Sequence, residues 1–289
     1  MTKVRPTPFP EQNRNAPFNA SGVVRVGSRR FVFVDNKDPT ALFEMTFDPD
    51  VVAVRRIHRR PLAGVAKGML RDPEGLTRVD VNGEIFLVVA SSLCVADGNR
   101  ICDGLVRVRY ALDGELPAEP MTGFRDWLLD RVPALAAAGR REPDADGLNV
   151  EGLAWDGNAL LFGLRGPARP GHVTLVRVPA DVGGARWTTA SLGQPESIDV
   201  RLPEPAVTRG VRDISGAAGT GDFLLLLGRS TSHGDTPFRL ATWNRADDHA
   251  ALLDVTFHRT AKPEGVTTFT IGGRQRILIV DDAGGYAVL

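Results

Sequence analysis

Three glutamates stand in the same local pattern, each directly before a glycine and an apolar run: Glu74, Glu151 and Glu264. Carboxylates that converge on one place repel one another, unless a cation binds between them or basic residues intervene. Calcium is the first candidate cation, because it takes oxygen ligands from carboxylates, amides and water. A bound metal could polarise an ester or a phosphoester and activate water. The pattern therefore predicts a divalent-metal site with hydrolysis as its chemistry.

Basic and polar residues near these glutamates in the sequence allow a second interpretation. Guanidinium and ammonium groups could hold an anionic part of a ligand, and mixed charge signs favour a phosphate- or carboxylate-bearing small molecule over a bare calcium cage. The predicted ligand-binding residues are Asn149, Arg165, Asp213, Arg229, Lys262 and Asp281. In a third interpretation no ligand binds: the same side chains form salt bridges that close a channel, and the glycines only serve the backbone.

An internal repeat must position these residues, because the glutamates recur with the same surroundings. Each copy is predicted to hold a short strand, a tight turn and a second, more apolar strand. Turns such as Asn-Gly and Gly-Gly are typical of hairpins. The copies start at Ser21, Glu74, Glu151, Ser215 and Glu264. Weaker strands follow most copies, so each unit is predicted to contain four antiparallel strands, which is the plan of a β-propeller blade.

We therefore predict an all-β fold, a five-bladed β-propeller that forms one domain over residues 1–289. The innermost strand of each blade would line the central channel and place the first residue of each copy at the channel mouth. The interval between the second and third copies is the longest and contains the run Trp127 to Leu129, which suits a short helix. A helical insertion is expected at about residues 124–146. Six blades are the alternative if this stretch holds two strands.

The two ends of the chain are predicted to meet in one blade. The last copy ends at Leu289 without an outer strand, and the stretch VRPTPF at residues 4–9 could supply it. Prolines are tolerated there, because an outermost strand has one unpaired edge. Such a closure would remove open strand edges that invite aggregation.

Composition excludes several classes of protein. Lys plus Arg and Asp plus Glu both total 35, and this balance argues against a nucleic-acid binder. The N-terminus lacks the apolar core of a signal peptide, and no apolar run is long enough to span a membrane, so a cytoplasmic location is expected. Cys94 and Cys102 are too few for a four-sulfur zinc site. They are interpreted as structural or incidental thiols, and whether they form a disulfide stays open.

The block LNVEGLAWDGNALLFGLRGP at residues 148–167, with VRDISGAAGTGDFLLLLGR and KPEGVT after it, carries a family resemblance. From about Ser21 to Asp282 the chain resembles an uncharacterised bacterial domain-of-unknown-function family of β-propellers, which implies a propeller without an assigned activity. The glutamate–glycine starts more distantly resemble esterase-like phytase propellers and calcium-dependent lactonase and gluconolactonase propellers. The second resemblance implies a divalent metal in the channel, held by carboxylates such as Glu74, Glu151 and Glu264.

These observations predict a small-molecule-binding or metal-dependent hydrolytic propeller with its site at the channel mouth. Esters, lactones and phosphoesters are the expected substrates, and calcium is the expected cation. The alternative is a non-catalytic scaffold that binds a protein partner, because propellers host many unrelated functions and the fold does not decide between them.

Overall fold

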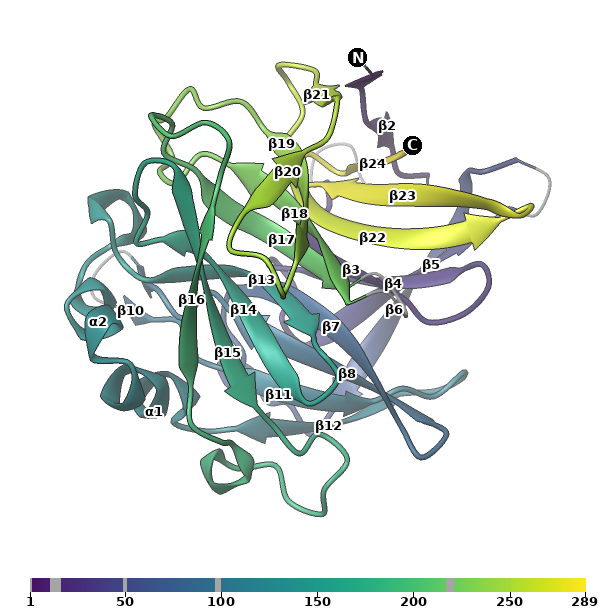
Figure 1. The fold of residues 1–289 in the computed structure, drawn as a ribbon. Coiled ribbons are helices and arrows are strands. Elements are labelled where there is room, and N and C mark those ends of the chain that lie inside the picture. The colour runs from purple at the N-terminus through teal and green to yellow at the C-terminus, as the bar shows by residue number, and fades with distance from the viewer. Residues whose placement is uncertain (1, 11–16, 49–50, 97–99, 217–220) are drawn as a thin grey trace.

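The computed structural model describes residues 2–10, 17–48, 51–96, 100–216 and 221–289 (Figure 1). The fold is all-β, as predicted, and the helices are short segments at its periphery. The largest sheet contains, in spatial order, β3 (Ala20–Arg25), β4 (Arg30–Asp35), β5 (Ala41–Phe47), β6 (Val54–Ala63), β12 (Leu116–Met121), β11 (Leu105–Arg109), β8 (Glu84–Ser91) and β7 (Pro73–Val81). It consists of two antiparallel units of four strands, which a short parallel pairing between β6 and β12 joins.

Three further sheets have four strands each. One contains β13 (Asn149–Trp155), β14 (Ala159–Gly166), β15 (His172–Pro179) and β16 (Glu196–Arg201). The next contains β17 (Gly210–Gly216), β18 (Asp222–Gly228), β19 (Arg239–Asn244) and β20 (Ala250–Leu252). The last contains β22 (Pro263–Ile271), β23 (Arg274–Asp281), β24 (Gly285–Val288) and β2 (Thr7–Pro8). Two short pairs lie outside these sheets: β1 (Thr2–Val4) with β21 (Val255–Phe257), and β9 (Val95–Ala96) with β10 (Arg100–Ile101).

The first strands of these units form a ring. Strand β3 contacts β7, β7 contacts β13, β13 contacts β17, β17 contacts β22, and β22 contacts β3 again. The remaining strands of each unit extend outward from this ring (Figure 1). The result is a β-propeller-like architecture, which confirms the general fold prediction. The amino ends of all ring strands lie at one mouth of the ring, and their carboxyl ends lie at the other.

A β-bulge near the start of each ring strand determines where its first side chains point. The pairing shifts between the residue pairs Ser21/Val23, Pro73/Gly75, Val150/Gly152, Val211/Asp213 and Pro263/Gly265. A bulge leaves one residue unpaired and re-aims its side chain. The unpaired residues of the second, third and fifth ring strands are the three repeat glutamates.

Close strand packing explains the glycine after each glutamate. A Cβ atom on Gly75 would lie 2.8 Å from the Cβ of Leu153 on the next ring strand. A Cβ atom on Gly152 would lie 3.0 Å from the backbone nitrogen of Ile214. The glycine is therefore needed because a neighbouring strand approaches there, and neither residue lies in a turn.

The fourth copy of the repeat starts three residues earlier than the sequence alignment predicts. The bulge of β17 leaves Arg212 unpaired, so Arg212, and not Ser215, occupies the position of the repeat glutamates. Ser215 lies near the other end of β17, where its Oγ is 3.5 Å from Thr267 Oγ1. The prediction that Ser215 lies at the same mouth as the glutamates is therefore wrong. The register of β17 is set by its pairing with β18. An alignment of the apolar runs in the repeat copies does not reveal that register.

The two ends of the chain meet in one sheet, as predicted. Strand β2 pairs antiparallel with β24, with Thr7 opposite Tyr286 (Figure 1). Phe9 follows β2 and is 3% exposed. Its ring stacks on Phe33, with centroids 5.4 Å apart, and on Tyr286, with centroids 5.6 Å apart. Phe9 thus joins the first ring unit to the last one through a shared aromatic cluster.

Two helices follow β12: α1 (Phe124–Arg131) and α2 (Pro133–Ala136). They lie in the segment for which the sequence predicts a helical insertion. Phe124 and Leu128 are fully buried, and the Phe124 ring stacks on Phe162 of β14 with centroids 5.3 Å apart. The helices thus cover the hydrophobic core between two neighbouring sheets. None of the helices described here is long and apolar enough to cross a membrane.

Candidate functional site

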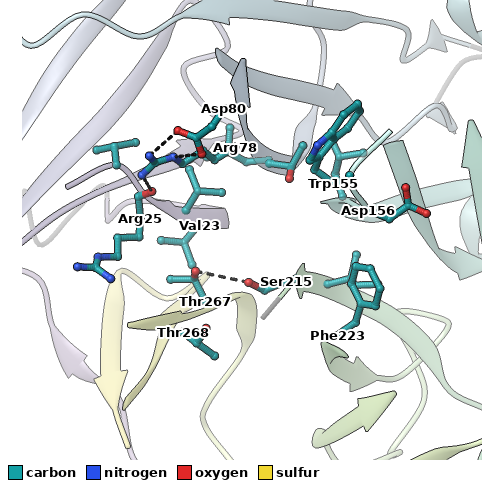
Figure 2. A pocket seen from close by; sticks show the side chains of 18 of the residues that line it. Val23, Arg25, Arg78, Asp80, Trp155, Asp156, Ser215, Phe223, Thr267 and Thr268 are labelled. Atoms are coloured by element: carbon teal, nitrogen blue, oxygen red, sulfur yellow. Dashed lines mark hydrogen bonds and ion pairs between the residues drawn. The ribbon is translucent and has the colours of Figure 1, made fainter. Parts of the chain in front are cut away.

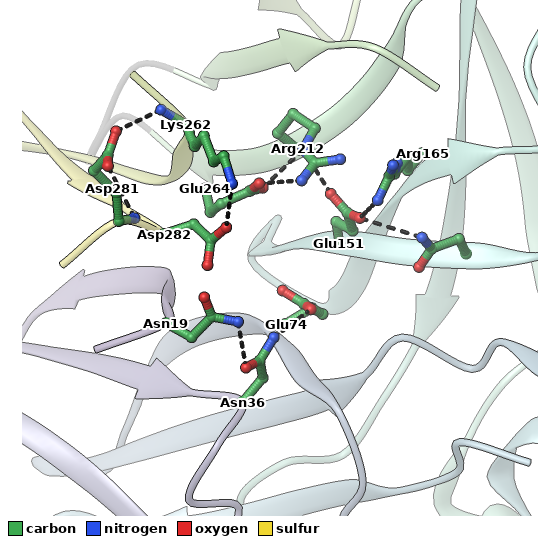
Figure 3. Close-up of polar contacts among 12 residues, drawn as sticks. Asn19, Asn36, Glu74, Glu151, Arg165, Arg212, Lys262, Glu264, Asp281 and Asp282 are labelled. Atoms are coloured by element: carbon green, nitrogen blue, oxygen red, sulfur yellow. Dashed lines mark hydrogen bonds and ion pairs between the residues drawn. The ribbon is translucent and has the colours of Figure 1, made fainter. Parts of the chain in front are cut away.

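The amino ends of the ring strands bring the repeat glutamates to one mouth, as predicted. Glu74 comes from β7, Glu151 from β13 and Glu264 from β22, and Arg212 of β17 lies between the last two (Figure 3). Glu151 is 3% exposed and Glu264 is 8% exposed, while Glu74 is partly buried. Three carboxylates that are largely shielded from solvent need positive charges or hydrogen-bond donors nearby. The arrangement of arginines around them supplies it.

Arg212 bridges two of the glutamates. Its Nε lies 2.7 Å from Glu264 Oε2 and 2.8 Å from Glu151 Oε2, and its Nη2 contacts Glu264 Oε1. Arg165 Nη1 donates a hydrogen bond of 2.8 Å to Glu151 Oε1. Burial alone would lower the pKa of Arg212, but the charges of Glu151 and Glu264 outweigh it and raise that pKa. Basic residues therefore compensate these carboxylates, which is one of the two solutions that the sequence left open.

Glu74 has a different environment. Asn36 Nδ2 donates a hydrogen bond of 3.3 Å to its Oε1. Desolvation raises the pKa of Glu74 well above its ordinary value, and the charges of Asp72, Glu151 and Glu264 add to this rise. Burial likewise raises the pKa of Glu264 to about 8, although Arg212 opposes the shift. The mouth thus combines a carboxyl group that favours its neutral form, Glu74, with one that forms two ion pairs, Glu151.

These shifts predict that stability falls as the pH rises from about 5 to about 8. The folded protein keeps protons on Glu74 and Glu264 in this window, whereas the unfolded chain has released them. The folded state therefore binds more protons, so the free energy of unfolding decreases with pH until the folded pKa values are passed. Glu74→Gln keeps the shape and removes one titrating group.

Urea unfolding of Glu74→Gln across this window should show a weaker pH dependence than the wild type, by on the order of 1 kcal/mol. The exposed Glu115 offers the matched control, and Glu115→Gln should keep the wild-type dependence. The same dependence in Glu74→Gln and in the wild type would contradict the neutral state of Glu74.

A pocket of about 340 Å³ opens at this mouth. Its lining includes Asp72, Glu74, Cys94, Asn149, Glu151 and Arg165. Three buried atoms of this wall find no hydrogen-bond partner among the residues that the structure describes: Asn149 Oδ1, Glu151 Oε2 and Arg165 Nε. Glu151 Oε2 is close to Arg212, but the contact lacks hydrogen-bond geometry. The pocket therefore offers both donors and acceptors to a ligand.

The structure separates the predicted ligand-binding residues into two groups. Asn149 and Arg165 line the pocket. The others lie outside its lining: Asp213, Arg229, Lys262 and Asp281. Asp213 Oδ2 accepts the backbone N–H of Val266 at 2.7 Å, and Asp281 Oδ2 accepts the backbone N–H of Lys262 at 2.6 Å. Both carboxylates thus hold backbone segments in place, and a ligand-binding role for the outer group stays a prediction.

The predicted ligand-binding and metal-binding residues do not include Arg212, Asp72 or Cys94. A signal for Arg212 exists, because the run Val-Arg-Asp-Ile at residues 211–214 matches Val-Glu-Gly-Leu at residues 150–153. This match puts the arginine in the place of the glutamate. Asp72 has a signal too, because it precedes Glu74 by two residues, as Asn149 precedes Glu151. Cys94 carries no comparable signal, because the fold brings it to the pocket from a segment that the repeat does not align.

The predicted metal ligands can be tested against this geometry. Arg212 lies between Glu151 and Glu264 and uses oxygens of both. In the described parts of the chain, side-chain ligand atoms close enough to share an ion occur in a different group: Asp72, Cys94 and Cys102. The arrangement does not fit one cation held by all three glutamates, and we derive no chemistry through such an ion. Calcium binding stays a prediction.

The opposite mouth of the ring holds a larger pocket of about 820 Å³ (Figure 2). The ring strands line it with apolar side chains such as Val23 and Trp155 and with Ser215, and Phe223 at the start of β18 also lines it. Arg78 and Asp80 form an ion pair at its edge. The two mouths thus differ in character: carboxylates dominate the lining of the first, and the second combines apolar side chains with charged and hydroxyl-bearing ones.

The fold and this polar mouth define a β-propeller-like protein with a carboxylate-lined pocket at the amino ends of its ring strands. The chain belongs to the family described as "Protein of unknown function (DUF3616)", whose model matches residues 141–287. This match confirms the predicted membership of an uncharacterised family. No curated protein sequence matches the chain.

Solved structures with a similar fold include two that cover 94% or more of this chain. One is the major allergen Mala s 1 of Malassezia sympodialis, at 9% identity and a TM-score of 0.54, over 94% of this chain and 90% of that one. The other is a GH43 β-1,3-galactosidase with galactodeoxynojirimycin, at 9% identity and a TM-score of 0.54, over 100% of this chain and 94% of that one. At this identity the similarity concerns the fold alone.

Proposed function

We propose that the protein is a five-bladed β-propeller that hydrolyses a small, uncharged polar molecule, a lactone or an ester, in the pocket between Glu74 and Glu151. The closed ring of β3, β7, β13, β17 and β22 supports the blade number, because each ring strand begins a unit of four strands. The observation that carries the function is the pair of carboxyl groups in one pocket with opposite environments.

The two carboxyl groups suit acid–base catalysis. A carboxyl group whose pKa is raised can donate a proton near neutral pH, and a carboxylate that stays ionised can accept one. Glu151 would take a proton from water as that water attacks the carbonyl carbon. Glu74 would give its proton to the oxygen of the breaking C–O bond. Asn149 Oδ1 and Arg165 Nε have no partner in the described structure and can orient the substrate.

The charge of the pocket restricts the substrate class. Its lining contains the acidic residues Asp72, Glu74, Glu142, Asp144 and Glu151. Arg165 is the basic side chain of that lining. An anionic phosphoester would be repelled by this wall. We therefore place lactones and esters before phosphoesters in the predicted substrate range. An anionic substrate would need a cation such as calcium in the pocket. Calcium-dependent hydrolysis of a phosphoester is therefore a separate proposal.

The test is a hydrolysis panel with chromogenic esters, lactones, phosphoesters and aryl glycosides. Glycosides are included because a GH43 β-1,3-galactosidase has a similar fold. We expect turnover of an ester or a lactone, and we expect Glu151→Gln and Glu74→Gln each to lower kcat/KM by about 100-fold or more. Asp80→Asn alters the opposite mouth and should leave kcat/KM within about twofold of the wild type.

Parallel thermal unfolding with each substrate class, and with EDTA, calcium, magnesium or manganese, reports binding independently of turnover. A calcium-dependent rise in Tm that Glu151→Gln abolishes would favour the metal-dependent form of the function. The absence of both turnover and a thermal shift with every class would overturn the proposal and favour a scaffold for a protein partner.

A further inference from the structure

The two cysteines lie together beside the pocket. Strands β9 and β10 form a hairpin, and Cys94 and Cys102 flank its paired residues. The backbone N–H of Cys102 donates to the carbonyl oxygen of Cys94 at 2.9 Å. Both thiols are free, and the residues are 4% and 2% exposed. The hairpin thus presents two sulfur atoms on one side, toward the start of β7.

Asp72 completes a group of three potential ligands. It directly precedes β7, and its Oδ2 lies 4.0 Å from Cys94 Sγ. One ligand atom from each of Asp72, Cys94 and Cys102 lies within 4.8 Å of the other two. A tetrahedral zinc site has Zn–S and Zn–O distances of about 2.3 and 2.1 Å, which separates its ligand atoms by about 3.5–3.8 Å. Small side-chain rotations would therefore bring all three into zinc coordination.

We propose that Asp72, Cys94 and Cys102 bind one Zn²⁺ ion, with the fourth coordination position open to the pocket at the amino-end mouth. Sulfur ligands select zinc over calcium or magnesium, which prefer oxygen. Three protein ligands with one exchangeable position are typical of catalytic zinc sites. The site differs in place and ligand type from a calcium ion held by the repeat glutamates.

The surroundings support an open zinc site. Asp72 and Cys94 both line the 340 Å³ pocket. Asn149 and Glu151 line the same pocket, are 5% and 3% exposed, and have oxygen atoms without a hydrogen-bond partner among the described residues. These oxygens could accept hydrogen bonds from a zinc-bound water molecule. That water would then supply the hydrogen-bond partners that the two buried oxygens lack.

Ser92 holds two of the proposed ligands in place. Its Oγ donates a hydrogen bond of 3.2 Å to Cys94 Sγ, and its backbone N–H donates to the Asp72 carbonyl oxygen at 2.9 Å. Outer hydrogen bonds of this kind orient metal ligands and tune their donor strength. Zinc binding would also deprotonate both thiols and release their protons to solvent.

The test uses the reduced full-length protein after removal of metals by a chelator. Zinc is titrated in competition with a chromophoric chelator, and Co²⁺ is titrated while the sulfur-to-cobalt charge-transfer absorption is recorded. We expect one equivalent of either metal per chain, a Kd for zinc of about 1 µM or tighter, proton release on binding, and a charge-transfer band that identifies thiolate ligands.

Three variants locate the site. Cys94→Ser and Cys102→Ser should each weaken zinc binding by about 100-fold or more, and Asp72→Asn by about 10- to 100-fold. Asp80→Asn, at the opposite mouth, should bind like the wild type. Circular dichroism verifies that each variant is folded, and Asp72→Asn keeps the hairpin thiols intact if a cysteine variant does not fold.

Several results would overturn the proposal. Cobalt binding without a charge-transfer band would place the metal on the carboxylates alone. A reduced protein that binds no zinc, together with a Cys94–Cys102 disulfide in the purified chain, would show that the pair is a structural or redox-active disulfide. The inference does not depend on the proposed hydrolysis, because the readout is metal binding, so either proposal can fail while the other stands.

Discussion

Arg212→Met is expected to lower the free energy of unfolding by about 3–5 kcal/mol near neutral pH. The substitution removes the guanidinium that contacts Glu151 and Glu264 and leaves the two buried carboxylates with less compensation. A buried charge without its partner is far more costly than a missing pair of charges. Urea unfolding of the variant and the wild type measures this loss.

Two further variants make the result specific. Arg201 forms an exposed ion pair with Asp248, and Arg201→Met should cost no more than about 1 kcal/mol. The double variant Arg212→Met with Glu151→Gln should recover part of the loss, because Glu151, which contacts both Arg165 and Arg212, then carries no charge. The loss should also be smaller near about pH 5, where the remaining carboxyl groups can bind protons. A loss below about 1 kcal/mol would show that water or another cation already compensates the glutamates.

Phe9→Ala is expected to cost about 3–5 kcal/mol of unfolding free energy. The ring of Phe9 is 3% exposed and stacks on Phe33 of the first unit and Tyr286 of the last unit. Its removal leaves a cavity at the place where the two ends of the chain close the ring. The backbone contact there is short, because β2 pairs with β24 over two residues and Phe9 adds one hydrogen bond to Gly284, so we expect side-chain packing to supply much of the closing energy.

Leu112→Ala provides the comparison, since Leu112 is 64% exposed and should lose less than about 0.5 kcal/mol. Hydrogen exchange adds a spatial readout, because a weakened closure should increase exchange in β24 and β4 before the remaining strands. Equal stability of Phe9→Ala and the wild type would contradict a role of the N-terminal segment in ring closure.

The contrast between Glu74 and Ser215 shows how far the repeat could be interpreted from sequence. A glutamate followed by a glycine and an apolar strand marks the unpaired position at the start of a ring strand. The glycine is required there because the next ring strand approaches closely. The fourth copy has Arg212 and Asp213 at the corresponding places, and Asp213 bonds to the backbone of β22 through its carboxylate. Because the fourth copy lacks a glycine at that place, the sequence alignment matched Ser215 and Gly216 instead. These two are a polar residue followed by a glycine, but they lie three residues too far along the chain.

The cysteine pair shows the opposite case. Two thiols eight residues apart in the sequence indicate a hairpin and nothing about a third ligand. Asp72 reaches them because the backbone N–H of Ser92, directly after the neighbouring strand β8, bonds to the Asp72 carbonyl oxygen. That contact depends on the pairing of β7 with β8, which sequence spacing does not encode locally.

Sequence patterns were sufficient to predict the all-β class, the repeating unit, the closure by the N-terminal segment and the meeting of Glu74, Glu151 and Glu264 at one mouth. These features follow from local periodicity, turn residues and a repeated pattern, which act over a few residues. The contacts of Arg212 with two of the glutamates, and of Asp72 with the thiols, became visible in the folded chain. Pairing register and bulges decide which side chains meet across neighbouring strands, and these depend on contacts between segments far apart in the chain.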